Sequence, residues 1–270
     1  MKNIVLIDFT EESIDALRYA VDFTKAIDGT LEILNVTDND KSFEDGQRLM
    51  DLKKQYSSAD FEIKVNELIG NVEEEITEFV NGQKIGFVFC GTHDLKFLER
   101  FFASRVMNIM NHVKANFVFV PHNLKKYEPV KEVLMPVFSD KHSLQNIEAL
   151  RYLHHFMPFN IKIVTNSKPT PEAKSNLLVA TKLLQNSQLT YSIETFGDSE
   201  DELRKQLADL GRLTKSDLIS IVNLTEQNLF NFGTKGFVEH LIRNEQGLPV
   251  LVIQNQETEV YSGFHTAGGY

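Results

Sequence analysis

The sequence predicts an α/β protein built from two successive copies of a parallel β-sheet unit covered by helices. Three matches between the halves, all in the same order, carry this prediction. Residues 3–8 return as 132–137 about 129 positions later, 70–76 return as 197–203, and 116–120 return as 249–253. Ordered matches with small drifts in spacing indicate a duplicated unit of roughly 125 residues.

Two kinds of apolar pattern alternate along each copy. Short apolar runs without helical spacing are typical of buried parallel strands, and stripes repeating every three or four residues are typical of helices lying on a sheet. In the first half the predicted strands are 3–8, 31–36, 61–68, 85–90 and 117–121, and the predicted helices are 11–27, 43–56, 71–82 and 95–113. In the second half the strands are 132–138, 159–165, 189–196, 217–223 and 249–254, and the helices are 142–156, 171–186, 199–214 and 228–244. Strict alternation of this kind favours a parallel sheet with helices on both faces.

Capping residues mark where several helices begin. Thr10 stands before two acidic residues and the first apolar stripe, and glycines at 70 and 197 end a strand before a cap residue and further acids. Acidic side chains in a first turn suit the helix dipole. Residues 122–129 link the halves, so we expect domains at 1–124 and 130–254 and a C-terminal tail at 255–270.

Composition excludes several classes of protein. With 38 acidic and 28 basic side chains the net charge is −10, which disfavours binding to nucleic acid or to an anionic membrane surface. The lone cysteine, Cys90, excludes an internal disulfide framework and a cysteine-based zinc site. No apolar run approaches the ~20 residues of a membrane helix, and Asp8 interrupts any signal peptide. We therefore expect a cytoplasmic protein.

Several segments resemble universal stress proteins. Residues 2–10 followed by a helix are similar to the family's first strand and loop, as are Phe89-Cys90-Gly91-Thr92-His93 after the fourth strand and the closing run 117–121. Residues 127–134 are similar to the joint of tandem, two-domain members, so the resemblance covers about residues 2–254. It implies two Rossmann-like domains, each a five-stranded parallel sheet of order 3-2-1-4-5 with helices on both faces.

Duplicated domains commonly inherit the symmetric contact of an ancestral dimer. In the family this contact uses the fifth strands, here 117–120 and 250–253. We therefore expect an intramolecular pseudo-dimer about a pseudo-twofold axis, with two separate sheets rather than one continuous sheet. A homodimer of the whole chain is also open.

The resemblance further implies a candidate nucleotide site in the first half, because many family members bind ATP or AMP while others bind no nucleotide. The family pattern is Gly-x-x-Gly, nine residues, then Gly-Ser or Gly-Thr. Here Gly91 keeps the first glycine, Asp94 replaces the second, and the final pair falls on Ala103-Ser104 or Ser104-Arg105.

Further positions of the crevice follow from the same resemblance. Asp8 matches the acid beside the base, Val36 the adenine contact, and Cys90 the residue before the glycine; Phe9 borders the crevice. The candidate ligands are therefore ATP or AMP, with Mg²⁺ only if ATP is bound.

Asp94 is the main departure from the family pattern. A carboxylate about 4 Å from a phosphate oxygen repels it by roughly 1 kcal/mol in water and about 4 kcal/mol at a protein surface. Mg²⁺ bridging could offset this repulsion, and capping the following helix explains Asp94 without any ligand. We expect Asp94→Gly to strengthen metal-free ATP binding by roughly 1–3 kcal/mol.

The second half departs further from the pattern. No acid follows Val137 directly, and Asn223, after the fourth strand, stands where the first half has a glycine. Gly233-Thr234 retains only a fragment of the pattern. Any nucleotide is therefore expected in the first half, with the second half as a structural partner.

These observations favour a universal-stress-type protein that acts by binding an adenine nucleotide or a protein partner in a stress response. No phosphate-binding loop with Gly-Lys-Ser/Thr, nucleophile elbow or His-Glu-x-x-His pattern is present, so neither catalytic residues nor a metal site are predicted. Two alternatives remain open at this point. One is a ligand-free scaffold or dimerisation protein, and the other is a slow Mg²⁺-dependent ATPase using Asp8 and Asp94.

Overall fold

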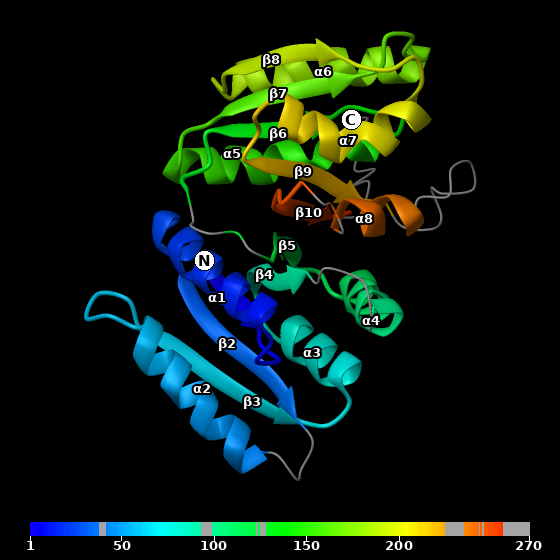
Figure 1. The fold of residues 1–270 in the computed structure, drawn as a ribbon. Helices are drawn as coiled ribbons and strands as arrows, with labels where there is room; N and C mark the ends of the chain where they lie inside the picture. Colours follow the sequence, from blue (N-terminus) through cyan, green and yellow to red (C-terminus); the bar gives the residue numbers. More distant parts are fainter. Residues whose placement is uncertain are drawn as a thin grey trace, which may run out of the picture.

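The computed structural model describes residues 1–37, 42–92, 99–122, 124, 128–224, 235–242, 244 and 246–255, without side chains at 42, 99–104 and 235. The elements of the first half are β1 Lys2–Leu6, α1 Glu11–Ala26, β2 Thr30–Thr37, α2 Ser42–Tyr56, β3 Ile63–Ile69, α3 Val72–Asn81, β4 Ile85–Thr92, α4 Glu99–His112 and β5 Asn116–Pro121. Those of the second half are β6 Glu132–Pro136, a 3₁₀ turn Lys141–Gln145, α5 Asn146–Phe156, β7 Asn160–Thr165, α6 Pro171–Asn186, β8 Tyr191–Thr195, α7 Glu200–Leu213, β9 Leu218–Asn223, α8 Lys235–Ile242 and β10 Val250–Gln254. Every predicted strand and helix has its counterpart (Figure 1).

The strand order confirms the predicted topology of each half. The sheet runs β3-β2-β1-β4-β5-β10-β9-β6-β7-β8, so each half has the order third, second, first, fourth, fifth. Neighbouring strands within each half are parallel.

The expectation of two separate sheets is wrong. β5 and β10 pair antiparallel, with Val118 opposite Leu251, and this pairing joins the halves into one ten-stranded mixed sheet. The fifth strands do form the contact, as expected, but they meet edge to edge. An edge strand carries a row of unpaired N–H and C=O groups, and antiparallel pairing satisfies those of both strands.

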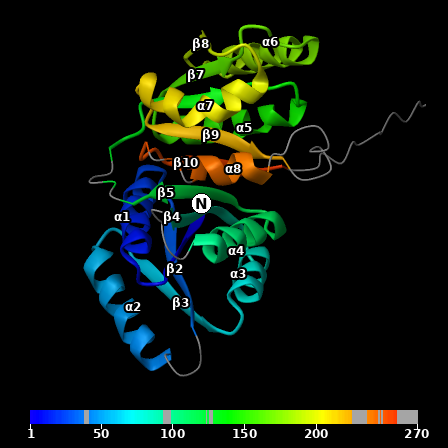
Figure 2. The ribbon, with the colours of Figure 1, turned by 45° about the vertical axis from the view of Figure 1, so that its right-hand side comes forward.

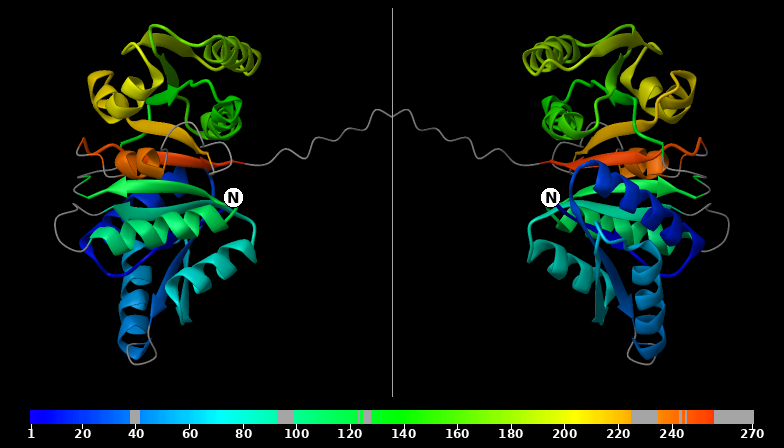
Figure 3. Two further views of the ribbon diagram at one scale, coloured as in Figure 1. Left: turned by 90° about the vertical axis from the view of Figure 1, so that its right-hand side faces the viewer. Right: turned by 90° about the vertical axis from the view of Figure 1, so that its left-hand side faces the viewer.

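Helices cover both faces of this sheet (Figures 2 and 3). One apolar core packs α1, α2, α5 and α6 against one face, and a second core packs α3, α4, α7 and α8 against the other. Alternate residues of β5 divide between them: Val118 and Val120 belong to the first core, and Phe117 and Phe119 to the second. A fully buried strand therefore supplies apolar side chains to both layers, which is why its sequence reads as a continuous apolar run.

The start of the helix predicted at 142–156 differs in the structure. Residues Lys141–Gln145 form a 3₁₀ turn, and the α-helix begins only at Asn146. The Asp140 side chain accepts a hydrogen bond from the His142 N–H at 2.8 Å and thereby caps the turn. Apolar periodicity does not distinguish a 3₁₀ first turn from an α-helical one.

Candidate functional site

A cavity of about 170 Å³ lies in the first half, at the carboxyl ends of its central strands. Leu6 of β1, Leu34 of β2 and Cys90 of β4 form part of its wall, and α3 and α4 close the other side with apolar residues such as Ile76 and Ile109. This is the point where the strand order reverses, which is the usual ligand crevice of parallel α/β sheets.

The polar rim of the cavity is built by the loop between β1 and α1. Asp8 Oδ1 accepts hydrogen bonds from the Thr10 N–H at 3.1 Å and from Thr10 Oγ1 at 2.5 Å. Thr10 in turn caps α1 by accepting from the Ser13 N–H at 3.3 Å. Asp8, Thr10 and Ser13 all line the cavity, so one capping motif both starts the helix and presents a carboxylate to the crevice.

Phe9, which was expected to border the crevice, does not line the cavity described here. Its backbone has a φ of 63°, in the left-handed region, and its ring packs against the core on the α1 and α2 side. The Arg48 guanidinium lies 3.8 Å from the ring centroid, in cation–π geometry. The ring therefore supports the opposite face of the sheet.

Val36 and Cys90 line the cavity from β2 and β4. Cys90 is 2% exposed, and burial, with a smaller contribution from the Asp8 charge, raises the pKa of its thiol to about 12. The thiol is therefore protonated at neutral pH and packs as a small apolar group.

Gly91 lines the cavity as well, but the structure gives it a second role. A Cβ at this position would lie 2.3 Å from the Glu12 carbonyl oxygen and 2.9 Å from the Ser13 nitrogen. The N-terminus of α1 thus rests directly on β4, and it can do so only because residue 91 has no side chain. Glycine is required here by helix packing whether or not a ligand binds.

The remaining predicted site residues cannot be placed in the same way. Asp94 lies outside the described residues, and Ser104 belongs to α4 but its side chain is not described. The next residue, Arg105, is exposed and lines the cavity. A cation therefore stands at the rim, together with the Asp8 carboxylate.

Strand registry defines which residues of the second half correspond to these. The Ile7 N–H donates to the Leu34 carbonyl as the Val137 N–H donates to the Val164 carbonyl, so Phe138 takes the place of Asp8. Gly91 pairs with Val120 as Val222 pairs with Ile253. Val222, not Asn223, therefore stands in the register of Gly91, and the one-residue shift arises because the spacing between the halves drifts along the chain.

Side chains of the second half fill its own crevice. The corresponding cavity encloses about 20 Å³. The Arg204 guanidinium lies 3.8 Å from the Phe138 ring centroid and 5.1 Å from that of Phe237, and it pairs with Glu200 at 3.7 Å. Burial of the guanidinium lowers the pKa of Arg204. Among the described residues, the crevice of the first half therefore has much the larger open space.

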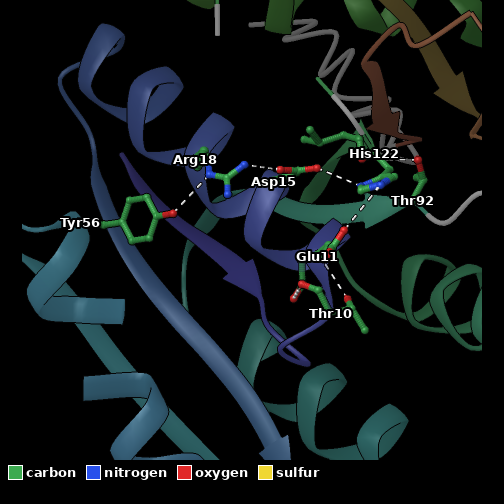
Figure 4. Close-up of polar contacts among 9 residues, drawn as sticks. Thr10, Glu11, Asp15, Arg18, Tyr56, Thr92 and His122 are labelled. Atoms are coloured by element: carbon green, nitrogen blue, oxygen red, sulfur yellow. Dashed lines mark hydrogen bonds and ion pairs between the residues drawn. The ribbon is translucent and has the colours of Figure 1, made fainter. Parts of the chain in front are cut away.

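A polar cluster that the sequence did not reveal joins α1 to the residue after β5 (Figure 4). His122 Nδ1 lies 3.0 Å from Asp15 Oδ2, and His122 Nε2 lies 4.0 Å from a Glu11 carboxylate oxygen. Asp15 also pairs with Arg18, whose pKa is raised chiefly by its hydrogen bond to Tyr56. No local motif could have revealed it, because 107 residues separate Asp15 from His122.

Within the described ranges, no group of three or more His, Cys, Asp or Glu side chains is arranged to hold a metal ion. None of the helices in the described part of the chain is both long and apolar enough to cross a membrane.

Comparison with known proteins gives one family model that matches the first half and several solved structures with a similar fold. The model of the universal stress protein family matches residues 1–121. A universal stress protein from Archaeoglobus fulgidus has a similar fold, with a TM-score of 0.75 at 14% identity over 94% of this chain and 98% of its own. A protein of unknown function from Pseudomonas aeruginosa aligns with a TM-score of 0.59 at 9% identity over 94% of this chain and 92% of its own. No curated protein sequence matches the chain. Residues 1–121 are therefore a universal stress protein domain, and the 270-residue chain fits a tandem arrangement of this fold.

Proposed function

We propose that this protein binds an adenine mononucleotide in the cavity of its first half and acts in a stress response through that binding, without turnover. The observation that carries the proposal is the difference between the two crevices. The first is open, at about 170 Å³, and the second is reduced to about 20 Å³ by its own side chains. A duplicated fold that has kept one crevice open is expected to use that one.

The chemistry of the open cavity suits a base linked to a phosphate. Its walls are apolar, and the described part of its rim carries one carboxylate, of Asp8, and one guanidinium, of Arg105. Only Oδ1 of Asp8 is used by Thr10, so Oδ2 can accept a hydrogen bond from an exocyclic amine. Arg105 can pair with a phosphate oxygen. We favour AMP over metal-free ATP because repulsion from the Asp8 carboxylate at the rim, and from Asp94 at the second glycine of the family pattern, grows with ligand charge.

The proposal includes the organisation of the chain. We assign residues 1–124 and 130–254 to two domains that form an intramolecular pseudo-dimer, with 255–270 as a tail. The register of β5 against β10 supports this assignment. In the repeat, Phe117 corresponds to Val250 and Phe119 corresponds to Val252, and in the sheet Phe117 lies opposite Val252 while Phe119 lies opposite Val250. Such reciprocal pairing is what a twofold axis between the strands generates.

The test is calorimetric titration of the purified chain with AMP, with ATP, and with ATP plus Mg²⁺, paired with thermal unfolding. Arg105→Ala should weaken AMP binding about tenfold through loss of a charge-assisted contact. Arg212→Ala is the matched control, because this arginine of α7 donates to Gln246 at 3.1 Å and does not line the cavity. An affinity lost equally in both variants would contradict the site.

The same experiment separates the alternatives. A ligand present at a thousand times its dissociation constant adds about 4 kcal/mol to stability, so an unchanged melting temperature in millimolar nucleotide would favour the ligand-free scaffold. Phosphate release that disappears in Asp94→Ala would favour the ATPase.

A further inference from the structure

Side chains of the second half hold helix α4 of the first half across the β5–β10 seam. Gln254 Nε2 donates to the Met110 carbonyl at 2.6 Å, and Asn223 Nδ2 donates to Asn111 Oδ1 at 3.2 Å. The two amides are themselves connected, since Asn223 Nδ2 also donates to Gln254 Oε1 at 3.0 Å. The Gln254 N–H is fixed by Asn116 Oδ1 at 3.0 Å.

Most of this network is buried, and only Asn111, at its outer edge, is exposed. Asn223 is 4% exposed and Gln254 is 7% exposed, and the Met110 side chain has no exposed surface. Hydrogen bonds in such surroundings are strong, and a group that loses its partner there cannot turn to bulk water. The network therefore holds the C-terminal half of α4 in one position relative to β9 and β10.

The same stretch of α4 forms one wall of the open cavity. Arg105, Val106 and Ile109 line the cavity, and Ile109 directly precedes Met110. A displacement of Met110 and Asn111 would therefore move the apolar wall and the rim guanidinium together, because less than two helical turns separate Arg105 from Asn111.

At the positions compared next, the described residues of the second half contact α4, but those of the first half do not contact α8 in return. Gln254 pairs with Asn223 across β10 and β9 as Pro121 pairs with Thr92 across β5 and β4. Thr92 Oγ1 donates to the Val120 carbonyl within its own half, at 3.4 Å, and proline has no side-chain donor. Within the described residues, the first half thus returns no equivalent contact to α8 from these positions.

We infer that Asn223 and Gln254 are positioning residues, through which the second half sets the wall of the first half's cavity. The end of the fourth strand is where a parallel α/β sheet places ligand contacts. In the second half these positions instead support the neighbouring site. The effect on ligand binding rests on the proposed function, whereas the effect on α4 does not.

The experiment compares Asn223→Leu with Asn176→Leu in the full chain. Asn176 is the matched control, because it is an equally buried amide whose bonds, to the Phe138 and Ser139 carbonyls, stay within the second half. Hydrogen–deuterium exchange of the amides in Arg105–His112 should be about tenfold faster in Asn223→Leu and unchanged in Asn176→Leu. The dissociation constant of AMP should rise about tenfold in Asn223→Leu alone.

A third variant, Gln254→Glu, should change the exchange of the α4 amides in a pH-dependent way, which a general loss of stability would not do. An ionised glutamate cannot donate to the Met110 carbonyl, but the protonated acid can. The α4 amides should therefore lose their protection from hydrogen–deuterium exchange at neutral pH. This protection should return as the pH falls through the pKa of the introduced carboxyl.

Two outcomes would overturn the inference: wild-type exchange of α4 in Asn223→Leu, or equal acceleration in Asn176→Leu. If the wild-type chain binds no AMP, the proposed function fails, and the exchange data on α4 still decide this inference.

Discussion

Replacing Gly91 by alanine tests whether the contact between α1 and β4 dictates this residue. The added Cβ would lie 2.3 Å from the Glu12 oxygen and 2.5 Å from the Glu12 carbonyl carbon, both about 1 Å short of an ordinary contact of 3.4 Å. Both atoms belong to the backbone, so neither can rotate away. The whole N-terminal turn of α1 would have to move off the sheet.

That movement is opposed by the rest of the helix. Leu17 and Phe23 of α1 are completely buried, and the Phe23 ring packs against Phe89 of β4 at 5.3 Å between centroids. Overpacking in a well-filled core typically costs about 1–3 kcal/mol. Because the obstruction here is backbone, we expect Gly91→Ala to lower the free energy of unfolding by about 3 kcal/mol, at the upper end of that range.

Urea unfolding followed by circular dichroism measures this loss, and Gly86→Ala in the same strand is its control. There the added Cβ would meet the Met1 side chain, with Sδ at 2.1 Å, but Met1 is 45% exposed and can rotate into solvent. We expect Gly86→Ala to change stability by no more than about 0.5 kcal/mol. Equal unfolding free energies for the two variants would refute the reasoning.

Further predictions concern Cys90, Arg204 and Thr10. Cys90, with a pKa raised from 9.0 to about 12, should resist thiol reagents at pH 8 in the native state and react once unfolded. Since the folded chain holds this proton more tightly, its stabilisation should be full below pH 9 and disappear as the pH rises toward 12, a loss that urea titrations of Cys90→Ala should not show. Arg204→Ala should destabilise the chain by about 3 kcal/mol because it leaves the buried Glu200 carboxylate without its cation, and calorimetry should find much of this recovered in the double variant Arg204→Met/Glu200→Gln. Thr10→Ala removes the cap of α1 and should cost about 1 kcal/mol in the same urea assay, whereas Thr181→Ala, in the middle of α6 and away from either cap, should cost almost nothing.

The candidate site could be predicted from the sequence in part. Asp8, Val36, Cys90 and Gly91 surround one cavity because each follows or ends a strand of a parallel sheet, and the ends of such strands meet at one edge. Phe9 is not part of it, because its ring packs against the core on the α1 and α2 side. The residue types gave no signal of which face this ring would take.

The alternation of strands and helices and the duplication were determined by the sequence alone, because they depend on periodicity and on short-range capping, which a linear pattern records directly. The strand order of each half followed from the resemblance to universal stress proteins and not from periodicity. Three features were decided only by the tertiary structure. They are the pairing of β5 with β10, the filling of the second crevice by Arg204, and the hydrogen bonds from Asn223 and Gln254 to α4. Each depends on side chains or strand edges far apart in the sequence, and their meeting depends on distances that emerge only when the layers pack.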